Sequence, residues 1–254
     1  MNGLMCQHYA IQSKIIGGDN VDSYELTNFV VGIYIDDGEW CGGSIISSKC
    51  VITAAHCLYE KNKAKLYFGY IRLSSPPSGA VNMNASHDDF IIHNEFSPIT
   101  LANDIAGIVL RTTLSFTTQI IQPIQLFSKY DSYNYSLESG AATLCGWGFT
   151  SDSSTTLSDF LQYVDVYLMS IDSCKKFYPN VTKFNLCTTS GSNVAKGGCR
   201  GDSGHGLAAQ INSSRKLIGI LSFRSKNGCN SLDPRGYTNI VEYSNWICQN
   251  FRVC

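Results

Sequence analysis

The sequence predicts an all-β fold, and two observations support this class. Short runs rich in β-branched and aromatic residues recur along the whole chain. Turn-forming residues separate these runs, as in Asp36-Asp37-Gly38 and Asn227-Gly228. Many short strands at such spacing are typical of a β-barrel or β-sandwich and not of alternating strands and helices. The runs that we expect to form strands are 29–35, 44–54, 65–73, 105–110, 161–169, 216–223 and 236–240.

The first half of the chain gives the clearest strand boundaries. Run 29–35 ends at the Asp-Asp-Gly turn. Run 65–73 ends at segment 74–79, which holds two prolines and a glycine. Because proline and glycine interrupt regular structure, both runs are predicted to be short strands followed by turns.

Two later segments have a different character. Segment 128–139 is rich in Tyr, Ser and Asn, lies about mid-chain, and is predicted to link two halves of the protein. The stretch 243–251 is the best candidate for a helix, with Ser244 or Asn245 as its N-cap. The chain is therefore expected to end in a helix that follows the last strand.

Composition limits the size of the domain and its partners. With 254 residues, of which 44% are hydrophobic, the chain can form one large all-β domain or two smaller ones. The formal net charge of −1 gives no support for binding to nucleic acid or to an anionic membrane. No apolar run reaches the roughly 18 residues that a membrane-spanning helix needs.

Cysteines and glycosylation sequons indicate the compartment. The chain holds 11 cysteines, a high count that favours an oxidising environment. Sequons of the form Asn-X-Ser/Thr begin at Asn84, Asn134, Asn180 and Asn212. Both features predict a secreted, extracellular glycoprotein.

Three short motifs hold residues suited to nucleophilic catalysis. His56 lies in Thr-Ala-Ala-His-Cys, Asp104 in Asn-Asp-Ile-Ala, and Ser203 in Gly-Asp-Ser-Gly. A serine hydroxyl is a weak nucleophile at neutral pH, and it needs a base to take its proton and a carboxylate to orient that base. Each residue alone would suit an ordinary structural position, but together they predict a catalytic triad.

A fourth motif, Lys14-Ile15-Ile16-Gly17-Gly18, precedes these three. The four motifs together resemble those of the chymotrypsin-like (trypsin-fold) serine protease family, and the resemblance extends from Ile15 to the C-terminus. It implies two six-stranded antiparallel β-barrels with the active site between them and a C-terminal helix. It also implies a pro-segment, or activation peptide, at 1–14 and a protease domain at 15–254.

The resemblance gives each motif residue a catalytic role. Ser203 would be the nucleophile, His56 the general base and then the general acid, and Asp104 the residue that orients His56. His56 and Asp104 would come from the first barrel and Ser203 from the second. The backbone amides of Gly201 and Ser203 would form the oxyanion hole.

The same resemblance implies synthesis as a zymogen. Cleavage after Lys14 would free the amino group of Ile15. That ammonium would pair with the carboxylate of Asp202 and so order the loop that supplies the oxyanion-hole amides.

The substrate pocket is where the chain departs from the family pattern. Its floor corresponds to Gly197, followed by Gly198, whereas trypsin-like members carry an aspartate there that holds Lys or Arg. A trypsin-like preference is therefore disfavoured. The segment Ser222-Phe223-Arg224 resembles the edge that pairs with extended substrate, and Arg224 replaces the usual glycine at the pocket mouth.

Arg235 is the second departure in the pocket. The family usually has glycine at this position, and granzyme B, which cleaves after Asp, is similar in carrying an arginine there. A guanidinium at the base of the pocket would bind a carboxylate through a bidentate bond. We therefore expect a preference for Asp or Glu before the cleaved bond. The alternative is that Arg235 points to solvent or simply fills the pocket.

Disulfide pairing is expected from the same family frames. Three bridges follow from them, and two further pairings are proposed by analogy with the fold. One cysteine of the 11 must stay unpaired within the chain, and Cys145 is predicted to be a buried free thiol. The expected pairs, in that order, are Cys41–Cys57, Cys174–Cys187, Cys199–Cys229, Cys50–Cys248 and Cys6–Cys254.

The implied function is that of a secreted serine endopeptidase, made as a zymogen, that hydrolyses peptide bonds through an acyl-enzyme. Its partners would be protein or peptide substrates, an activating protease and protein protease inhibitors, and it would act as a monomer. The alternative is a catalytically silent or weak homologue that acts as a binding protein. In that case Arg224, Arg235 and His205 would obstruct substrate.

No cofactor and no metal ion are expected. Residues 61–87 span the loop that binds calcium in trypsins, and this stretch contains no acidic residue. Hard cations need several carboxylate or carbonyl oxygens, so this chain offers no comparable site there.

Overall fold

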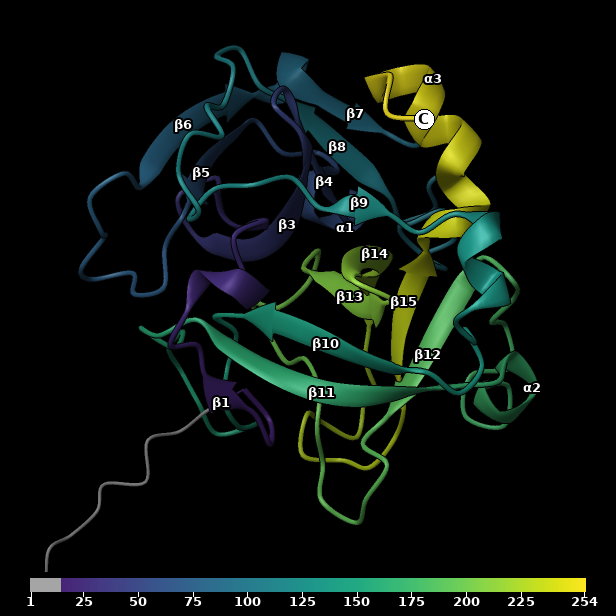
Figure 1. Cartoon of the computed structure of the whole chain (residues 1–254). Helices are drawn as coiled ribbons and strands as arrows, with labels where there is room; N and C mark the ends of the chain where they lie inside the picture. Colours follow the sequence, from purple (N-terminus) through teal and green to yellow (C-terminus); the bar gives the residue numbers. More distant parts are fainter. Residues whose placement is uncertain (1–14) are drawn as a thin grey trace, which may run out of the picture.

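Two curled antiparallel sheets form the protein and pack against each other (Figure 1). The computed structural model describes residues 15–254. Lys14, Cys6 and the predicted pro-segment 1–14 lie outside the described residues. The predicted all-β fold in two halves is confirmed, with one closed six-stranded barrel as expected and one seven-stranded half-barrel in place of the other.

The first sheet has seven strands in the order β6-β5-β2-β3-β4-β8-β7 and forms the upper part of Figure 1. No pairing within residues 15–254 joins β6 to β7, so this sheet is a curled half-barrel and not a closed barrel of six strands. A capping box between Ser86 and Asp89 turns the chain directly from β6 into β7, which pairs with β8. The strands are β2 (Val30–Ile35), β3 (Glu39–Ser47), β4 (Cys50–Thr53), β5 (Lys63–Phe68), β6 (Val81–Ser86), β7 (Phe90–Ile92) and β8 (Ala106–Val109).

The second sheet closes into a barrel of six strands. Its order is β1-β11-β10-β13-β14-β15-β12, and a further pairing between β11 and β12 completes the ring. β1 and β9 add to the outside of this ring. The strands are β1 (Asp19–Asn20), β9 (Gln125–Leu126), β10 (Ala141–Gly146), β11 (Gln162–Met169), β12 (Asn185–Thr189), β13 (Gly206–Ile211), β14 (Ser214–Phe223) and β15 (Arg235–Asn239).

Strand β11 shows why these residues form a barrel. Val164, Val166 and Leu168 are buried in the barrel core, whereas Asp165 and Tyr167 are exposed. Successive side chains of a strand point to opposite faces, so this alternation places one row inside and the other in water.

Helices are few and short, and the C-terminal one is confirmed. Helix α3 spans Ser244–Phe251, and its N-cap is Tyr243 instead of Ser244 or Asn245, because the 3₁₀ turn η4 runs straight into it. The ring of Phe251 packs against Gly107 of the first sheet. Within residues 15–254, no helix is both long and apolar enough to cross a membrane. The others are η1 (Tyr24–Leu26), α1 (Ala55–Leu58), η2 (His87–Asp89), η3 (Lys129–Tyr133), α2 (Ile171–Cys174) and η4 (Ile240–Tyr243).

The chain passes from the first sheet to the second between β8 and β9. The predicted linker 128–139 begins after β9 has already paired with β14, and it contains η3. The two halves therefore meet along a junction, and the residues predicted for catalysis come from elements on both sides of it.

Candidate active site

A histidine and a buried carboxylate are hydrogen-bonded at the junction between the halves. His56 lies in α1, directly after β4, and Asp104 lies in the loop before β8. Asp104 Oδ2 lies 2.8 Å from Nδ1 of His56, and Oδ1 accepts the His56 backbone N–H at 2.9 Å. A proton on Nδ1 makes this ring nitrogen the donor and leaves Nε2 as the acceptor that a general base needs.

Asp104 is held in place from the second half of the molecule. Ser222 in β14 donates its hydroxyl to Asp104 Oδ2 at 2.5 Å. Thr238 in β15 donates to the Asp104 backbone carbonyl at 2.7 Å. Asp104 is only 1% exposed, and the bonds from Ser222 and His56 satisfy the acceptor atoms of its buried carboxylate.

The environment of His56 makes it a stronger base. Burial by itself lowers its pKa, but the hydrogen bond and the charge of Asp104 outweigh burial, and the pKa of His56 lies above its usual value. The ring remains about one quarter exposed, so a reacting group can reach it.

Ser203 lies in the turn that leads from the pocket into β13. The backbone N–H of Gly42 in β3 donates to the Ser203 carbonyl at 2.7 Å, and Gly204 donates to the Leu221 carbonyl at 2.8 Å. Both sheets therefore fix this turn. Ser203 also lines a cavity of about 270 Å³ together with Ser222, the residue that holds Asp104. The three predicted catalytic residues are thus brought to one junction.

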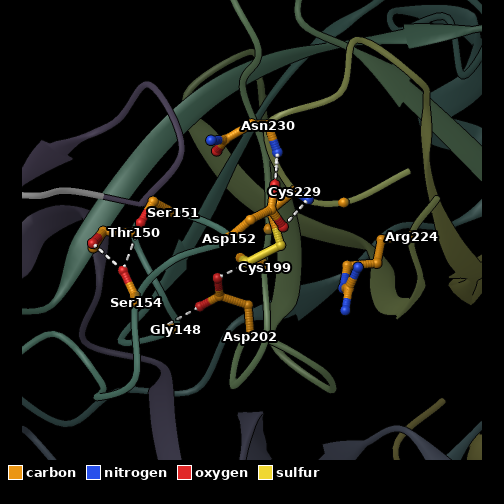
Figure 2. Close-up of a disulfide and its surroundings, with 12 residues drawn as sticks. Gly148, Thr150, Ser151, Asp152, Ser154, Cys199, Asp202, Arg224, Cys229 and Asn230 are labelled. Atoms are coloured by element: carbon orange, nitrogen blue, oxygen red, sulfur yellow. Dashed lines mark hydrogen bonds between the residues drawn. A yellow bond between two sulfur atoms is a disulfide. The ribbon is translucent and has the colours of Figure 1, made fainter. Parts of the chain in front are cut away.

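Asp202 is completely buried beneath this turn. Its Oδ1 accepts the Gly148 N–H at 2.8 Å and its Oδ2 accepts the Cys199 N–H at 2.9 Å (Figure 2). None of the ion pairs found within residues 15–254 includes Asp202. Burial therefore raises the pKa of Asp202 to about 7.

The segment that follows the predicted cleavage site is docked beside the pocket. Ile15 is fully buried in the core of the second barrel. Ile16 forms a β-bridge with Gly197, the predicted pocket floor. A new N-terminus at Ile15 would therefore begin in the half of the molecule that contains Asp202.

The cavity beside Ser203 corresponds to the predicted substrate pocket. It contains two arginines and no acidic side chain. Of the residues predicted for the pocket, Gly198 and the segment 222–224 line it, whereas Gly197 and Arg235 do not. The lining residues are Gly198, Cys199, Arg200, Gly201, Ser203, Leu221, Ser222, Phe223 and Arg224.

Arg235 fills the space beneath this pocket. Its side chain is 1% exposed, and its Cγ lies 3.0 Å from the point where a Cβ on Gly197 would stand. The guanidinium donates to the backbone carbonyls of Cys229, Asp233 and Gly198. Its donors are thus used by the protein itself, and its charge contributes to the pocket only as an electrostatic field.

Arg200 is a pocket residue that the sequence analysis missed. It lies between Cys199 and the predicted oxyanion-hole residue Gly201. This place in the sequence could have indicated that Arg200 lines the pocket. Arg224 also lines the pocket, and within residues 15–254 its side chain donates to the carbonyl of Ser225 alone, at 3.2 Å. Neither arginine belongs to an ion pair found in the described residues.

His205 packs behind the catalytic turn and does not line the pocket. It is fully buried, its ring lies 5.8 Å from that of Trp147, and Nδ1 is 3.1 Å from the Asp202 carbonyl. Burial lowers the pKa of His205 to about 4, so the ring is neutral at physiological pH. It cannot obstruct substrate from this position.

Three of the expected disulfides are present, and one bridge differs from expectation. Cys41–Cys57, Cys174–Cys187 and Cys199–Cys229 join as the family frames implied. Cys145 is buried and free, and burial raises its pKa to about 12. The remaining bridge of the described residues is Cys248–Cys254.

The predicted pairs Cys50–Cys248 and Cys6–Cys254 are therefore wrong. After α3 ends, Arg252 adopts a left-handed conformation with φ of 56° and turns the chain back. This turn brings the Cα atoms of Cys248 and Cys254 to 4.7 Å. Cys50 remains a buried free thiol in β4.

An aspartate-oriented histidine beside a serine turn, set between two curled antiparallel sheets, defines a chymotrypsin-like serine endopeptidase. Comparisons with known proteins agree with this class. The family model described as Trypsin matches residues 15–247, and the chain belongs to this family.

Two relatives named for protease activity support the same class. The chain is 32% identical to brachyurin of Leptuca pugilator over 85% of this chain and 89% of brachyurin. It is 34% identical to a collagenase of Hypoderma lineatum over 83% of this chain and 76% of the collagenase. A solved structure of HL collagenase superposes with a TM-score of 0.80 at 31% identity, covering 94% of this chain and all of that one.

Proposed function

We propose that this serine endopeptidase is secreted as a zymogen and becomes active when a protease cleaves it after Lys14. The buried carboxylate of Asp202 carries this proposal, because it is fully buried, accepts the backbone N–H groups of Gly148 and Cys199, and among the described residues is paired with no positive charge. The freed ammonium of Ile15 would supply that charge. Pairing inside the protein would hold Asp202 ionised and stabilise the turn that carries Ser203.

Ser203 would then attack the substrate carbonyl. Nε2 of His56 accepts the hydroxyl proton as the Ser203 Oγ–carbon bond forms, and the imidazolium is stabilised by Asp104. The backbone N–H groups of Gly201 and Ser203 would stabilise the negative charge on the carbonyl oxygen. His56 next donates its proton to the leaving amine as the carbon–nitrogen bond breaks, which releases the carboxy-terminal fragment of the substrate and leaves the amino-terminal part on Ser203 as an acyl-enzyme. A water molecule then attacks the acyl-enzyme, again with His56 as the base. The carboxylic acid product leaves, and Ser203 is regenerated.

We further propose that the enzyme prefers an acidic residue before the cleaved bond. The observation that supports this preference is the pocket itself, which two arginines line without any carboxylate. Arg224 would contact the substrate carboxylate directly, and the buried charge of Arg235 would act from below. This differs from the initial expectation, in which Arg235 itself formed the bidentate bond.

A peptide library tests this preference. The chain cleaved after Lys14 is expected to favour Asp or Glu over Leu and Lys at the residue before the cleaved bond, and Arg224→Gly is expected to reduce that selectivity about tenfold or more. Ser203→Ala serves as the inactive control. Unchanged selectivity in Arg224→Gly, or a preference for Lys, would contradict the proposal.

The partners follow from this function. Like other serine endopeptidases, the enzyme acts on protein substrates. We propose two further partners, namely an activating protease that cleaves after Lys14 and protein inhibitors that occupy the same pocket. We propose a monomer, because the site is assembled from the two halves of one chain.

A further inference from the structure

Asp152 joins two loops that are far apart in the sequence. It lies between β10 and β11, in the segment that follows Gly148. Its Oδ1 accepts the Cys229 N–H at 2.7 Å, and its Oδ2 accepts the Asn230 N–H at 2.9 Å (Figure 2). One carboxylate therefore binds two consecutive amides of the loop between β14 and β15, here called the wall loop, which contributes Arg224 to the pocket lining and is bonded through Cys229 to the lining residue Cys199.

The loop is shaped to receive this carboxylate. Gly228 has φ of +97°, and a Cβ on it would lie 2.5 Å from Oδ2 of Asp152. A side chain at this position would be strained and would also displace the carboxylate. Gly228 thus offers a second, independent way to disrupt the contact.

Both partners of the Asp152 contact, the loop that holds Cys229 and the segment that holds Asp152, are connected to the pocket. Cys229 is bonded to Cys199, which lines the cavity. At the other end of the segment, Gly148 donates to Asp202, and Phe149 donates to the Arg200 carbonyl at 2.7 Å. The segment 148–152 therefore spans from the buried carboxylate used in activation to the wall of the pocket.

Hydroxyl groups stabilise the turn that presents Asp152. Ser154 Oγ lies 3.1 Å from Thr150 Oγ1 and 2.9 Å from Ser151 Oγ (Figure 2). These bonds hold the backbone on either side of Asp152, which favours the orientation of its carboxylate toward the loop.

We propose that Asp152 is a positioning residue for substrate binding: it fastens the pocket wall to the segment that Asp202 anchors, so that the pocket takes its binding shape when Asp202 is anchored. This inference rests on the proposed protease function. Asp152 touches no reacting atom. It acts through the wall loop, which runs from Arg224 to Pro234 and leads into Arg235 of β15.

A purely electrostatic role for Asp152 leads to a different expectation. The two backbone amides and the nearby charges of Arg224 and Arg200 hold the pKa of Asp152 below its usual value, so it is ionised at neutral pH. If only this charge mattered, its removal would make the pocket more positive. Binding of acidic substrates would then improve, while binding of neutral substrates would stay the same.

Steady-state kinetics of the cleaved protein distinguish these roles. Asp152→Ala and Gly228→Ala are expected to raise KM about tenfold for acidic and neutral peptides alike, with kcat nearly unchanged, because each loses hydrogen bonds to a charged acceptor that hold the wall. Asp152→Asn keeps one acceptor oxygen and is expected to give a smaller rise. Thr156→Ala, a nearby exposed position outside the hydroxyl cluster, is the matched control and should match the parent.

Labelling of Ser203 by a small fluorophosphonate distinguishes a failure of the Asp152 positioning role from a failure of the protease function. The Asp152 and Gly228 variants should label at the parental rate, which also shows that they fold. Unchanged KM in both, or a lower KM for acidic peptides only, would overturn the positioning role. A cleaved parent that does not label would overturn the protease function and this inference with it.

Discussion

At the scale of single residues, the bond between His56 and Asp104 determines how the site responds to pH. His56 must be neutral to accept a proton from Ser203. Its pKa is raised above the usual value because Asp104 outweighs the effect of burial. The acid form therefore persists to higher pH than it would in an isolated histidine.

We expect kcat/KM to fall with decreasing pH, with an apparent pKa above about 6.5. A series between about pH 5 and pH 8 measures it. Asp104→Asn is the comparison, since it removes the negative charge that lies beside Nδ1 of His56. This variant should move the acid limb to lower pH and reduce the rate by a factor of about 10⁴, as in well-studied Ser-His-Asp hydrolases. A rate that is independent of pH in this range would exclude His56 as the base.

Sequence reasoning reached the triad because each member lies in a local motif that is readable without coordinates. It left open whether Arg235 binds substrate or fills the pocket, because the carbonyls that bind its guanidinium come from Gly198 and from the loop between β14 and β15. It missed Arg200 and Asp152 for the same reason. Their roles depend on contacts between distant segments, and no local pattern reports such contacts.

At the scale of elements, the strands follow from composition and the disulfides only in part. The C-terminal helix is present and each predicted run overlaps a strand, because alternation and turn residues are local signals. Run 44–54 is the exception as a single strand, since it covers the end of β3, a chain reversal and β4. The Cys248–Cys254 bridge could not be predicted, because it depends on a single left-handed residue after α3, Arg252. The curled seven-strand sheet likewise depends on how the chain turns between β6 and β7.

Peptide mapping without reduction tests the bridge assignments. We expect a fragment that holds Cys248 and Cys254 joined to each other, and no fragment that joins Cys248 to Cys50. Cys50 and Cys145 should react with iodoacetamide only after unfolding, because both thiols are buried and the pKa of each is raised. Rapid alkylation of either thiol in the folded protein would contradict this structure.

At the scale of the whole molecule, cleavage after Lys14 should change how stability depends on pH. The pKa of Asp202 is about 7 in the folded chain and about 3.9 in an unfolded one. Between these values the folded chain binds more protons, so the free energy of unfolding of the uncleaved form loses a contribution as pH rises. His205 acts in the opposite sense, since burial lowers its pKa to about 4, but it acts equally in both forms.

We therefore expect the cleaved form to gain stability relative to the uncleaved form as pH rises from about 4 to about 7. In the cleaved form the Ile15 ammonium keeps Asp202 ionised, which removes its share of the pH dependence. Paired Tm measurements at each pH give the difference directly. A difference that stays constant or narrows over this range would contradict pairing between Ile15 and Asp202.

The central claim is a nucleophilic Ser203 that is assembled by cleavage after Lys14. The most direct measurement is labelling by a fluorophosphonate of four proteins: uncleaved and cleaved parent, and uncleaved and cleaved Ser203→Ala. We expect rapid labelling of the cleaved parent and of none of the other three proteins. Equal labelling before and after cleavage would contradict activation at Ile15. No labelling of a cleaved parent with the new N-terminus verified would contradict the catalytic assignment and favour a binding protein.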